Sequence, residues 1–269
     1  MKSICQSYGL SRSGYYKAGR RAQKQQIQND QLLELVYPIR RILPRLGGRK
    51  LYYMISEELV KLSIKVGRDR FFDILRQEGL LIKVKKKYAR TTDSAHRFRT
   101  HNNLLTNTPI DQSHQAWVCD ITYIRTLEGF NYLALITDVY SRKIVGYDFS
   151  DSLELEGCKR ALMMAIRQLP SQYNLIHHSD RGFQYCSNVY TQILKKHNIQ
   201  ISMAEKGNCY ENAMAERVNG ILKQEFFLDE TFTTKHLAGK AVEQAIWTYN
   251  EIRPHFGIEL LTPNLKHVA

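Results

Sequence analysis

The sequence predicts an α/β fold, a mixed five-stranded sheet with helices, preceded by a helical N-terminal region. Three observations predict it. The chain has 269 residues, of which 43% are hydrophobic, enough for a sizeable core. The apolar pattern changes from helical spacing to strand-like runs near Gln115. The basic charge is confined to the front: residues 1–110 contain 23 Lys and Arg against 8 Asp and Glu, and residues 111–269 contain 16 against 18.

The N-terminal region, residues 1–82, is expected to be helical throughout. A short helix and a turn at Gly9 precede a helix that Ser11 can cap, and polar residues 19–30 continue in helical form. Helices then follow at Arg49–Leu59 and Gly67–Gln77, joined by a turn. Two short helices around a tight connection, the second one basic, fit a helix-turn-helix at about 47–80. An ordinary pair of antiparallel helices is the alternative.

Residues 83–112 lack sustained periodicity and are expected to form a basic linker. An N-terminal excess of positive charge favours nucleic-acid binding, although a solubilising surface would also explain it. The side chains expected to contact DNA are basic and lie on the second helix, in the linker and on a later helix: Arg68, Arg70, Arg76, Lys83, Lys85, Lys86, Lys87, Arg90 and Lys223.

The second half alternates strands and helices. The expected strands are Ala116–Arg125, Tyr132–Val139, Lys143–Phe149, Asn174–His178 and Gln200–Met203, and the expected helices are Leu153–Leu169, Gln184–His197, one starting near Asn208, and Lys235–Asn250. The first three strands should form an antiparallel meander, and the later two should add in parallel through helical crossovers. This is the order of a ribonuclease-H-like domain, assigned to residues 113–228, with residues 229–269 packed on it. The first strand is then central, with the fourth beside it.

Three carboxylates carry the chemical information. Asp120 lies in an apolar strand, Asp180 ends another, and Glu216 lies on a helix. A carboxylate in an apolar strand is unfavourable unless something compensates its charge. Divalent cations such as Mg²⁺ take oxygen ligands, and a pair of them can serve phosphodiester chemistry. Asp180 could instead serve only to form a turn, and Glu216 could be an ordinary solvent-exposed charge on a helix. Glu211 is the alternative to Glu216 as the third ligand.

The five cysteines are scattered and form no C-x-x-C pair, which argues against a disulfide framework or a zinc finger. No apolar leader or run of about 18 apolar residues is present. A cytoplasmic protein is therefore expected, without a membrane partner.

The motifs resemble the second-reading-frame transposase of the insertion-sequence-three group of bacterial mobile elements, in the DDE superfamily with retroviral integrases. The matching segments are Trp117–Tyr123, Tyr132–Asp138, Ser141–Gly146, His177–Tyr185, Gly207–Glu216, Leu222–Glu225 and Tyr249–Pro263, with Ser11–Tyr16 near the start. The gap of 35 residues between Asp180 and Glu216 is typical of that group. Glu211, where the family often has Asp, and Leu46–Gly48 depart from its pattern.

The resemblance implies Mg²⁺-dependent cleavage at element ends and strand transfer, with Asp120, Asp180 and Glu216 as ligands of two Mg²⁺ ions and Mn²⁺ as a substitute. It also implies terminal-repeat and target DNA as partners, a homo-oligomer in the synaptic complex, nucleoid association, and an upstream-frame protein or fusion, whose leucine zipper is not recognisable here. His178, Asn212 and Gln184 are candidates for supporting these ligands. A catalytically silent DNA-binding protein and a nuclease without strand transfer remain alternatives.

Overall fold

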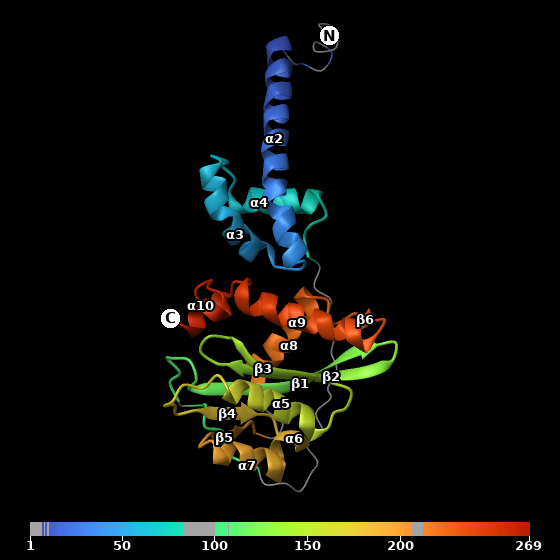
Figure 1. The fold of residues 1–269 in the computed structure, drawn as a ribbon. Coiled ribbons are helices and arrows are strands. Elements are labelled where there is room, and N and C mark those ends of the chain that lie inside the picture. The colour runs from blue at the N-terminus through green and yellow to red at the C-terminus, as the bar shows by residue number, and fades with distance from the viewer. Residues whose placement is uncertain (1–6, 8, 10, 83–99, 107, 206–211) are drawn as a thin grey trace. The chain divides into compact units, whose positions relative to one another are not determined.

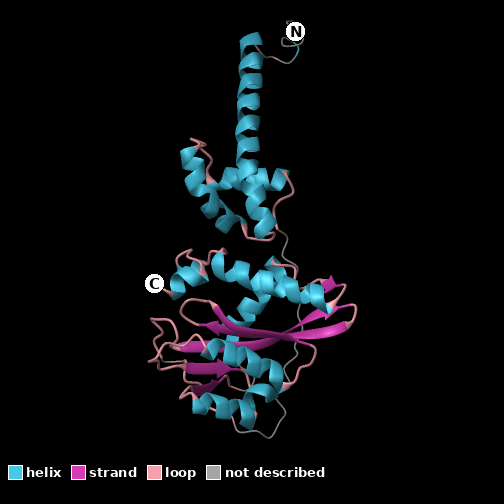
Figure 2. Cartoon of the chain, viewed as in Figure 1, coloured by secondary structure: helices cyan, strands magenta, loops and turns pink. Residues whose placement is uncertain are grey.

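The computed structural model describes residues 7, 9, 11–82, 100–106, 108–205 and 212–269. The chain divides into two compact units, residues 1–83 and 84–269. Figures 1 and 2 show the helices and strands of each unit. No helix in these ranges is both long and apolar enough to cross a membrane.

Within the described residues of the first unit there are three helices: α2 (Arg12–Ile42), α3 (Gly48–Lys61) and α4 (Arg68–Gln77). Ser11 caps α2, as expected, because its hydroxyl accepts a hydrogen bond from the Gly14 N–H at 2.9 Å. The segments expected to be helical between Ser11 and residue 42 form one continuous helix of 31 residues. Its first half is exposed, whereas its second half buries Leu32, Leu33 and Val36.

The C-terminal end of α2 is hydrogen-bonded to the segments that flank the two following helices. The Arg40 guanidinium donates to the carbonyl oxygens of Leu46 at 2.7 Å and Leu80 at 3.2 Å. Leu51 and Ile55 of α3 and Phe71 of α4 are buried in the core of this unit. The helices expected at 47–80 are therefore present, and their contact with DNA stays a prediction.

The second unit is a mixed sheet covered by helices on both faces. Its strands are β1 (Ala116–Thr126), β2 (Gly129–Asp138), β3 (Ile144–Ser150), β4 (Ile176–Ser179), β5 (Gln200–Met203) and β6 (Thr231–Phe232). The strand order is β3-β2-β1-β4-β5, with β6 also pairing with β1. The β1–β2 and β2–β3 pairs are antiparallel, and the β1–β4 and β4–β5 pairs are parallel. The predicted order is therefore right, but the count of five strands was wrong because β6 adds a sixth.

Two apolar clusters define the two covered faces of the sheet. On one face, α5 (Leu155–Ile166), α6 (Phe183–Cys186) and α7 (Asn188–Lys196) pack against alternate residues of β1 and β2. On the other face lie α8 (Ala213–Glu225) and α9 (Lys235–Glu251). Figure 1 shows these two layers on either side of the strands. A short 3₁₀ helix η2 (Phe256–Ile258) and α10 (Pro263–His267) follow α9.

The single helix expected over Gln184–His197 is two helices, so that prediction was wrong. Ser187 separates α6 from α7 with extended torsions, φ −63° and ψ 144°. Its hydroxyl accepts a hydrogen bond from the Tyr190 N–H at 3.3 Å. Because a serine that caps the next helix leaves the helical conformation, the chain bends between the two segments.

Close packing of β3 on α5 depends on a glycine. A Cβ atom on Gly146 would collide with the Ala161 carbonyl oxygen and would lie 3.0 Å from the Ala165 Cβ. The absence of a side chain at Gly146 therefore sets how closely α5 approaches the sheet.

Candidate active site

Asp120 and Asp180 lie side by side where two parallel strands stop pairing. The β1–β4 register ends with Cys119 opposite Ser179. Asp120 and Asp180 are the residues that immediately follow this last pair. The expectation that the fourth strand lies beside the first, so that these carboxylates become neighbours, agrees with this register.

Burial and repulsion act on the Asp120 carboxylate. Burial raises the pKa of Asp120, and the negative charge of Asp180 raises it further, to about 7. The more distant charge of Glu216 acts in the same direction. Hydrogen bonds oppose the shift: the Ile121 N–H donates to Oδ1 at 2.9 Å, and Asn219 Nδ2 donates to Oδ2 at 2.8 Å. The carboxylate is thus oriented on both oxygens, but among the described residues no positive charge offsets its desolvation.

Helix α8 supplies the third carboxylate and two amides. Asn212, immediately before the helix, donates from Nδ2 to the Cys119 carbonyl oxygen at 3.1 Å. Asn219 reaches Asp120, as described above. Both amides are buried, and the Oδ1 atom of each lacks a hydrogen-bond partner among the described residues. Glu216 lies between them along the helix but is exposed, and burial and Asp180 raise its pKa.

Asn219 is the functional candidate that sequence reasoning missed. It stands three residues after Glu216 and seven after Asn212, so the three side chains share one face of α8. That spacing was a usable signal, but it became informative only with the position of Asp120 known. Asn212, which was predicted to support the ligands, contacts the backbone of β1 beside Asp120, and its role stays a prediction.

The turn after β4 is shaped around Asp180. Its Oδ1 accepts a hydrogen bond from the Gly182 N–H at 3.0 Å. A Cβ atom on Gly182 would lie 2.9 Å from that same oxygen and 3.4 Å from Gln184 Oε1. A side chain at Gly182 would therefore press on the carboxylate. The Gln184 amide donates to the Leu153 carbonyl oxygen at 2.8 Å, so it ties α6 to the chain before α5.

The two histidines before Asp180 point to different faces of the sheet. His177 is buried, with Nε2 2.9 Å from Cys119 Sγ and 2.9 Å from the Tyr190 hydroxyl. Burial lowers the pKa of His177 to about 3, so it is neutral. His178 Nδ1 lies 2.8 Å from the Ser202 hydroxyl of β5. None of these three contacts involves a carboxylate of the site.

The donor set suits a hard divalent cation, although it is not gathered into a complete cluster. Within the described ranges, no three His, Cys, Asp or Glu side chains are grouped closely enough to hold a metal ion. Asp120 and Asp180 nevertheless present oxygen ligands whose mutual repulsion a cation would relieve. Glu216, being exposed, keeps the rotamer freedom to join them.

The predicted DNA contacts fall into three places. Arg68 and Arg76 are exposed on α4 and form ion pairs with Asp69 and Asp73, whereas Arg70 is half-buried. Lys223 lies on α8, with its Nζ 4.4 Å from the centre of the Tyr123 ring. Lys83, Lys85, Lys86, Lys87 and Arg90, like the competing Glu211, lie outside the described residues.

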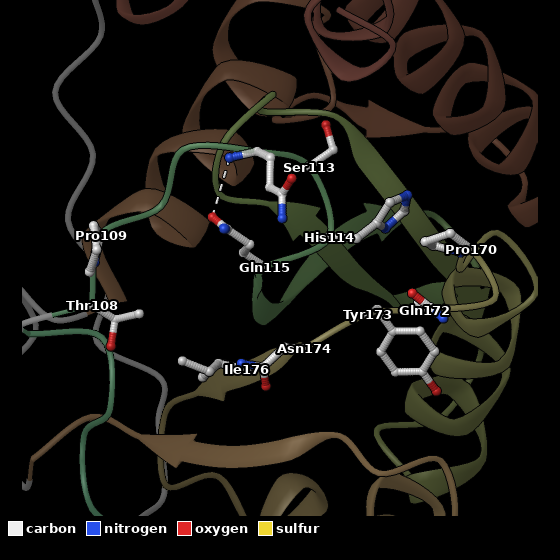
Figure 3. Close-up of a pocket in the computed structure, with 11 residues that line it drawn as sticks. Thr108, Pro109, Ser113, His114, Gln115, Pro170, Gln172, Tyr173, Asn174 and Ile176 are labelled. Carbon is white, nitrogen blue, oxygen red and sulfur yellow. Dashed lines mark hydrogen bonds between the residues drawn. The ribbon is translucent and has the colours of Figure 1, made fainter.

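A cleft of about 430 Å³ lies at the N-terminal ends of β1 and β4. His114, Gln115, Tyr173 and Asn174 are among the residues that line it (Figure 3). None of the three carboxylates lines it, so it is separate from the candidate site.

The chain is similar to known protein families and to individual proteins. Residues 111–209 match the family model described as "Integrase core domain", and residues 197–263 match a second model of the same description. An "Insertion element IS600 uncharacterized 31 kDa protein" of Shigella sonnei is 37% identical over 264 residues, covering 97% of this chain and 96% of that protein. "Transposase InsF for insertion sequence IS3A" of Escherichia coli is 31% identical over 269 residues, covering 98% and 92%.

The fold is shared with a solved structure. A chain of the simian T-cell lymphotropic virus intasome in complex with PP2A regulatory subunit B56 gamma matches with a TM-score of 0.50 at 17% identity, covering 83% of this chain and 75% of that one. The catalytic core of HTLV-2 integrase gives a TM-score of 0.47 at 19% identity, covering 58% and 97%. The predicted ribonuclease-H-like fold class is confirmed.

Proposed function

The chain belongs to the transposases of the insertion-sequence-three group, and on that premise we propose that Asp120, Asp180 and Glu216 form its catalytic site. The reaction is DNA cleavage at the ends of an insertion sequence followed by strand transfer, as in other DDE transposases. The observation that carries the assignment is the adjacency of Asp120 and Asp180, with the pKa of Asp120 raised to about 7. A buried pair of repelling carboxylates is costly unless it serves a cation or a proton.

Divalent cations fit this donor set. Asp120, Asp180 and Glu216 would together hold two Mg²⁺ ions, and Mn²⁺ would substitute. When bound, the cations activate water and stabilise the charge that develops on the transferring phosphate. The positive charge of the bound cations would then offset the repulsion between the carboxylates.

The protein's own groups hold the carboxylates in place. Asn219 and the Ile121 N–H fix the two oxygens of Asp120, and the Gly182 N–H fixes Asp180. These hydrogen bonds favour the charged form of each carboxylate, which is the form that ligates metal. Lys223, on the same helix face as Glu216, is suited to a DNA phosphate.

The first unit supplies the grip on DNA. Arg68, Arg70 and Arg76 of α4, together with the basic residues of 83–90, would contact phosphates, which is consistent with the excess of positive charge in residues 1–110. The DNA partners are the terminal repeats of the element and the target.

Joining two element ends requires more than one active site. We therefore propose a homo-oligomer in the synaptic complex, formed in the cytoplasm on nucleoid DNA. An upstream-frame protein, separate or fused, would be a further component of that complex.

The test uses the full chain, DNA that carries both element ends, and Mg²⁺ or Mn²⁺. Cleaved and joined strands are mapped on a sequencing gel. The wild type should nick at the ends and join them to target DNA, Asp120→Asn should do neither, and Asp148→Asn should behave as wild type because Asp148 forms a surface ion pair with Arg160. Binding without nicking would identify a silent DNA-binding protein, and nicking without joining a nuclease.

A test of the cation site that does not depend on activity is thermal denaturation with Mg²⁺. A ligand that binds only the folded state raises the melting temperature. The wild type should be stabilised by Mg²⁺, and Asp180→Asn should lose most of this effect.

A further inference from the structure

Four side chains form a continuous row beside the proposed catalytic site. Lys223 Nζ lies 4.4 Å from the centre of the Tyr123 ring, Tyr123 meets Phe130 edge to face with centroids 5.6 Å apart, and the Arg125 guanidinium carbon lies 5.5 Å from the Phe130 centroid. We call Lys223, Tyr123, Phe130 and Arg125 the aromatic–cation row. Its two aromatic rings lie between two positive charges.

The row lies at an accessible place on the sheet. Phe130 is 50% exposed and Arg125 is exposed, both near the tip of the hairpin that joins β1 and β2. Half of the Phe130 side chain remains in solvent, so core packing alone does not explain an aromatic ring at this position. The hairpin is held by its own anchor, because the Lys235 N–H donates to Glu128 Oε2 at 2.8 Å. The rings are therefore presented on a supported element.

The row begins beside the carboxylates, at an unpaired edge of β1. Tyr123 follows Asp120 by three residues, which is about 10 Å of extended strand, so its side chain projects to the opposite face of the sheet. Lys223 of α8 follows Asn219, which contacts Asp120, by one helical turn and reaches the Tyr123 ring across this edge. Among the described residues, no strand pairs with this edge of β1 between Cys119, where β4 ends, and Arg125, where β6 begins. A strand of DNA at Asp120 can therefore reach Tyr123 by passing over this edge.

We propose that the aromatic–cation row binds an unpaired DNA strand next to the phosphodiester being cut, with a base stacked on Phe130 or Tyr123 and phosphates at Arg125 and Lys223. This rests on the proposed function and extends it to the strand's recognition. Aromatic rings stack on any base, and a neighbouring cation attracts the backbone, which is the combination found where proteins hold single strands. About 10 Å corresponds to about three base steps, since the rise is about 3.4 Å per nucleotide.

The probe is an oligothymidylate of about 20 nucleotides carrying one 5-iododeoxyuridine, mixed with the full chain in EDTA and irradiated. Trypsin cuts after Arg125, so Tyr123 and Phe130 fall in different peptides and mass spectrometry separates them. Cross-links are expected in one or both of these peptides at those residues. Cross-links confined to other parts of the chain overturn the proposal.

Binding to the same single strand gives the second readout. Leucine keeps apolar bulk but removes the aromatic face, so Tyr123→Leu with Phe130→Leu should weaken binding about 5- to 150-fold, the range for losing one stacked base. Arg125→Gln should lower the slope of log affinity against log salt by about 0.7. Trp247→Leu, at an aromatic that is 57% exposed on α9, is the matched control and should bind as wild type.

Unchanged single-strand binding in the double leucine variant, with its melting temperature preserved, overturns the proposal whatever the cross-links show. If the variant melts early, the cross-linking result on the wild type decides. Because EDTA removes any role for catalysis, failure here is separate from failure of the proposed function, which is wild-type protein that neither cuts nor joins DNA with Mg²⁺.

Discussion

Replacing Asp120 by asparagine is expected to stabilise the metal-free protein above neutral pH. The pKa of Asp120 is about 7 in the folded protein against 3.8 for an ordinary aspartate, a difference of about three pH units. At about 1.4 kcal/mol per unit this corresponds to about 4 kcal/mol of destabilisation once the group is charged. Asparagine has one acceptor oxygen for the two donors, Ile121 and Asn219, and losing one hydrogen bond costs about 1 kcal/mol. Solvent access reduces the remainder, leaving a gain of about 2 kcal/mol.

The sign depends on pH. Between about pH 4 and 7 the folded wild type holds a proton that the unfolded chain releases, so its stability falls relative to the variant as the pH rises through this window. Denaturant unfolding in EDTA should be measured at about pH 4.5, 6 and 8, which together cover most of that window. The stability of the variant relative to wild type should grow with pH to about 2 kcal/mol. A gain of this size corresponds to about 4–8 °C in melting temperature.

Mg²⁺ should reverse the order, because it stabilises only the wild type appreciably. Asp148→Asn, which breaks a surface ion pair with Arg160, should show no stabilisation at any pH. A variant Asp120→Asn that is no more stable than wild type at pH 8 in EDTA, or whose difference from wild type is independent of pH, would refute the reasoning.

Three further predictions concern other contacts. Asn219→Ala removes the donor to Asp120 Oδ2 and should lower Mg²⁺-dependent strand transfer about 10- to 100-fold in a gel assay, with little change in melting temperature. Arg253→Ala strips Glu225 of a buried bidentate partner at 2.6 and 2.8 Å and should lower the free energy of unfolding by about 3–5 kcal/mol in urea. Gly146→Ala forces a Cβ against α5 and should cost about 1–3 kcal/mol or more by the same method.

Each of these has a matched control. Asn188→Ala removes an exposed amide on α7 and should leave strand transfer intact. Lys61→Ala breaks an exposed ion pair with Glu58 and should leave the free energy of unfolding nearly unchanged. Gly220→Ala meets no atom within 4 Å in the interior of α8 and should gain up to about 1 kcal/mol from helix propensity. Equal effects in a variant and its control would contradict the corresponding argument.

Strand order was predictable because it follows from connection lengths. The tight turn between β1 and β2 requires antiparallel pairing, and helical connections favour parallel pairing. The place of β4 beside β1 followed from the ribonuclease-H-like order of the elements. Shorter features were not predictable. β6 has two residues, too few for an alternating pattern, and it exists through pairing with Arg125 and Thr126 far away in sequence. Ser187 was absorbed into a helix because its cap is visible only in its torsions.

The site was predictable to the same depth. Asp120 stood out as a charge within an apolar strand, and its neighbour Asp180 followed from the strand order. Asn219 did not stand out, because an amide on a helix has the same appearance in sequence whether it faces solvent or a carboxylate. Its role depends on which face of α8 meets β1, and tertiary packing alone decides that.

The residue before Asp120 gives the protein a native chemical reporter. Cys119 is fully buried against His177 and Tyr190, and burial raises the pKa of its thiol well above the usual range. A thiol in this state does not react with alkylating agents while the strands are closed. Its rate of labelling, followed by peptide mass spectrometry, therefore measures how often the junction between β1 and β4 opens. Ligands that tighten the carboxylate pair would slow that labelling, and thiol-directed inhibitors would act on the opened protein alone.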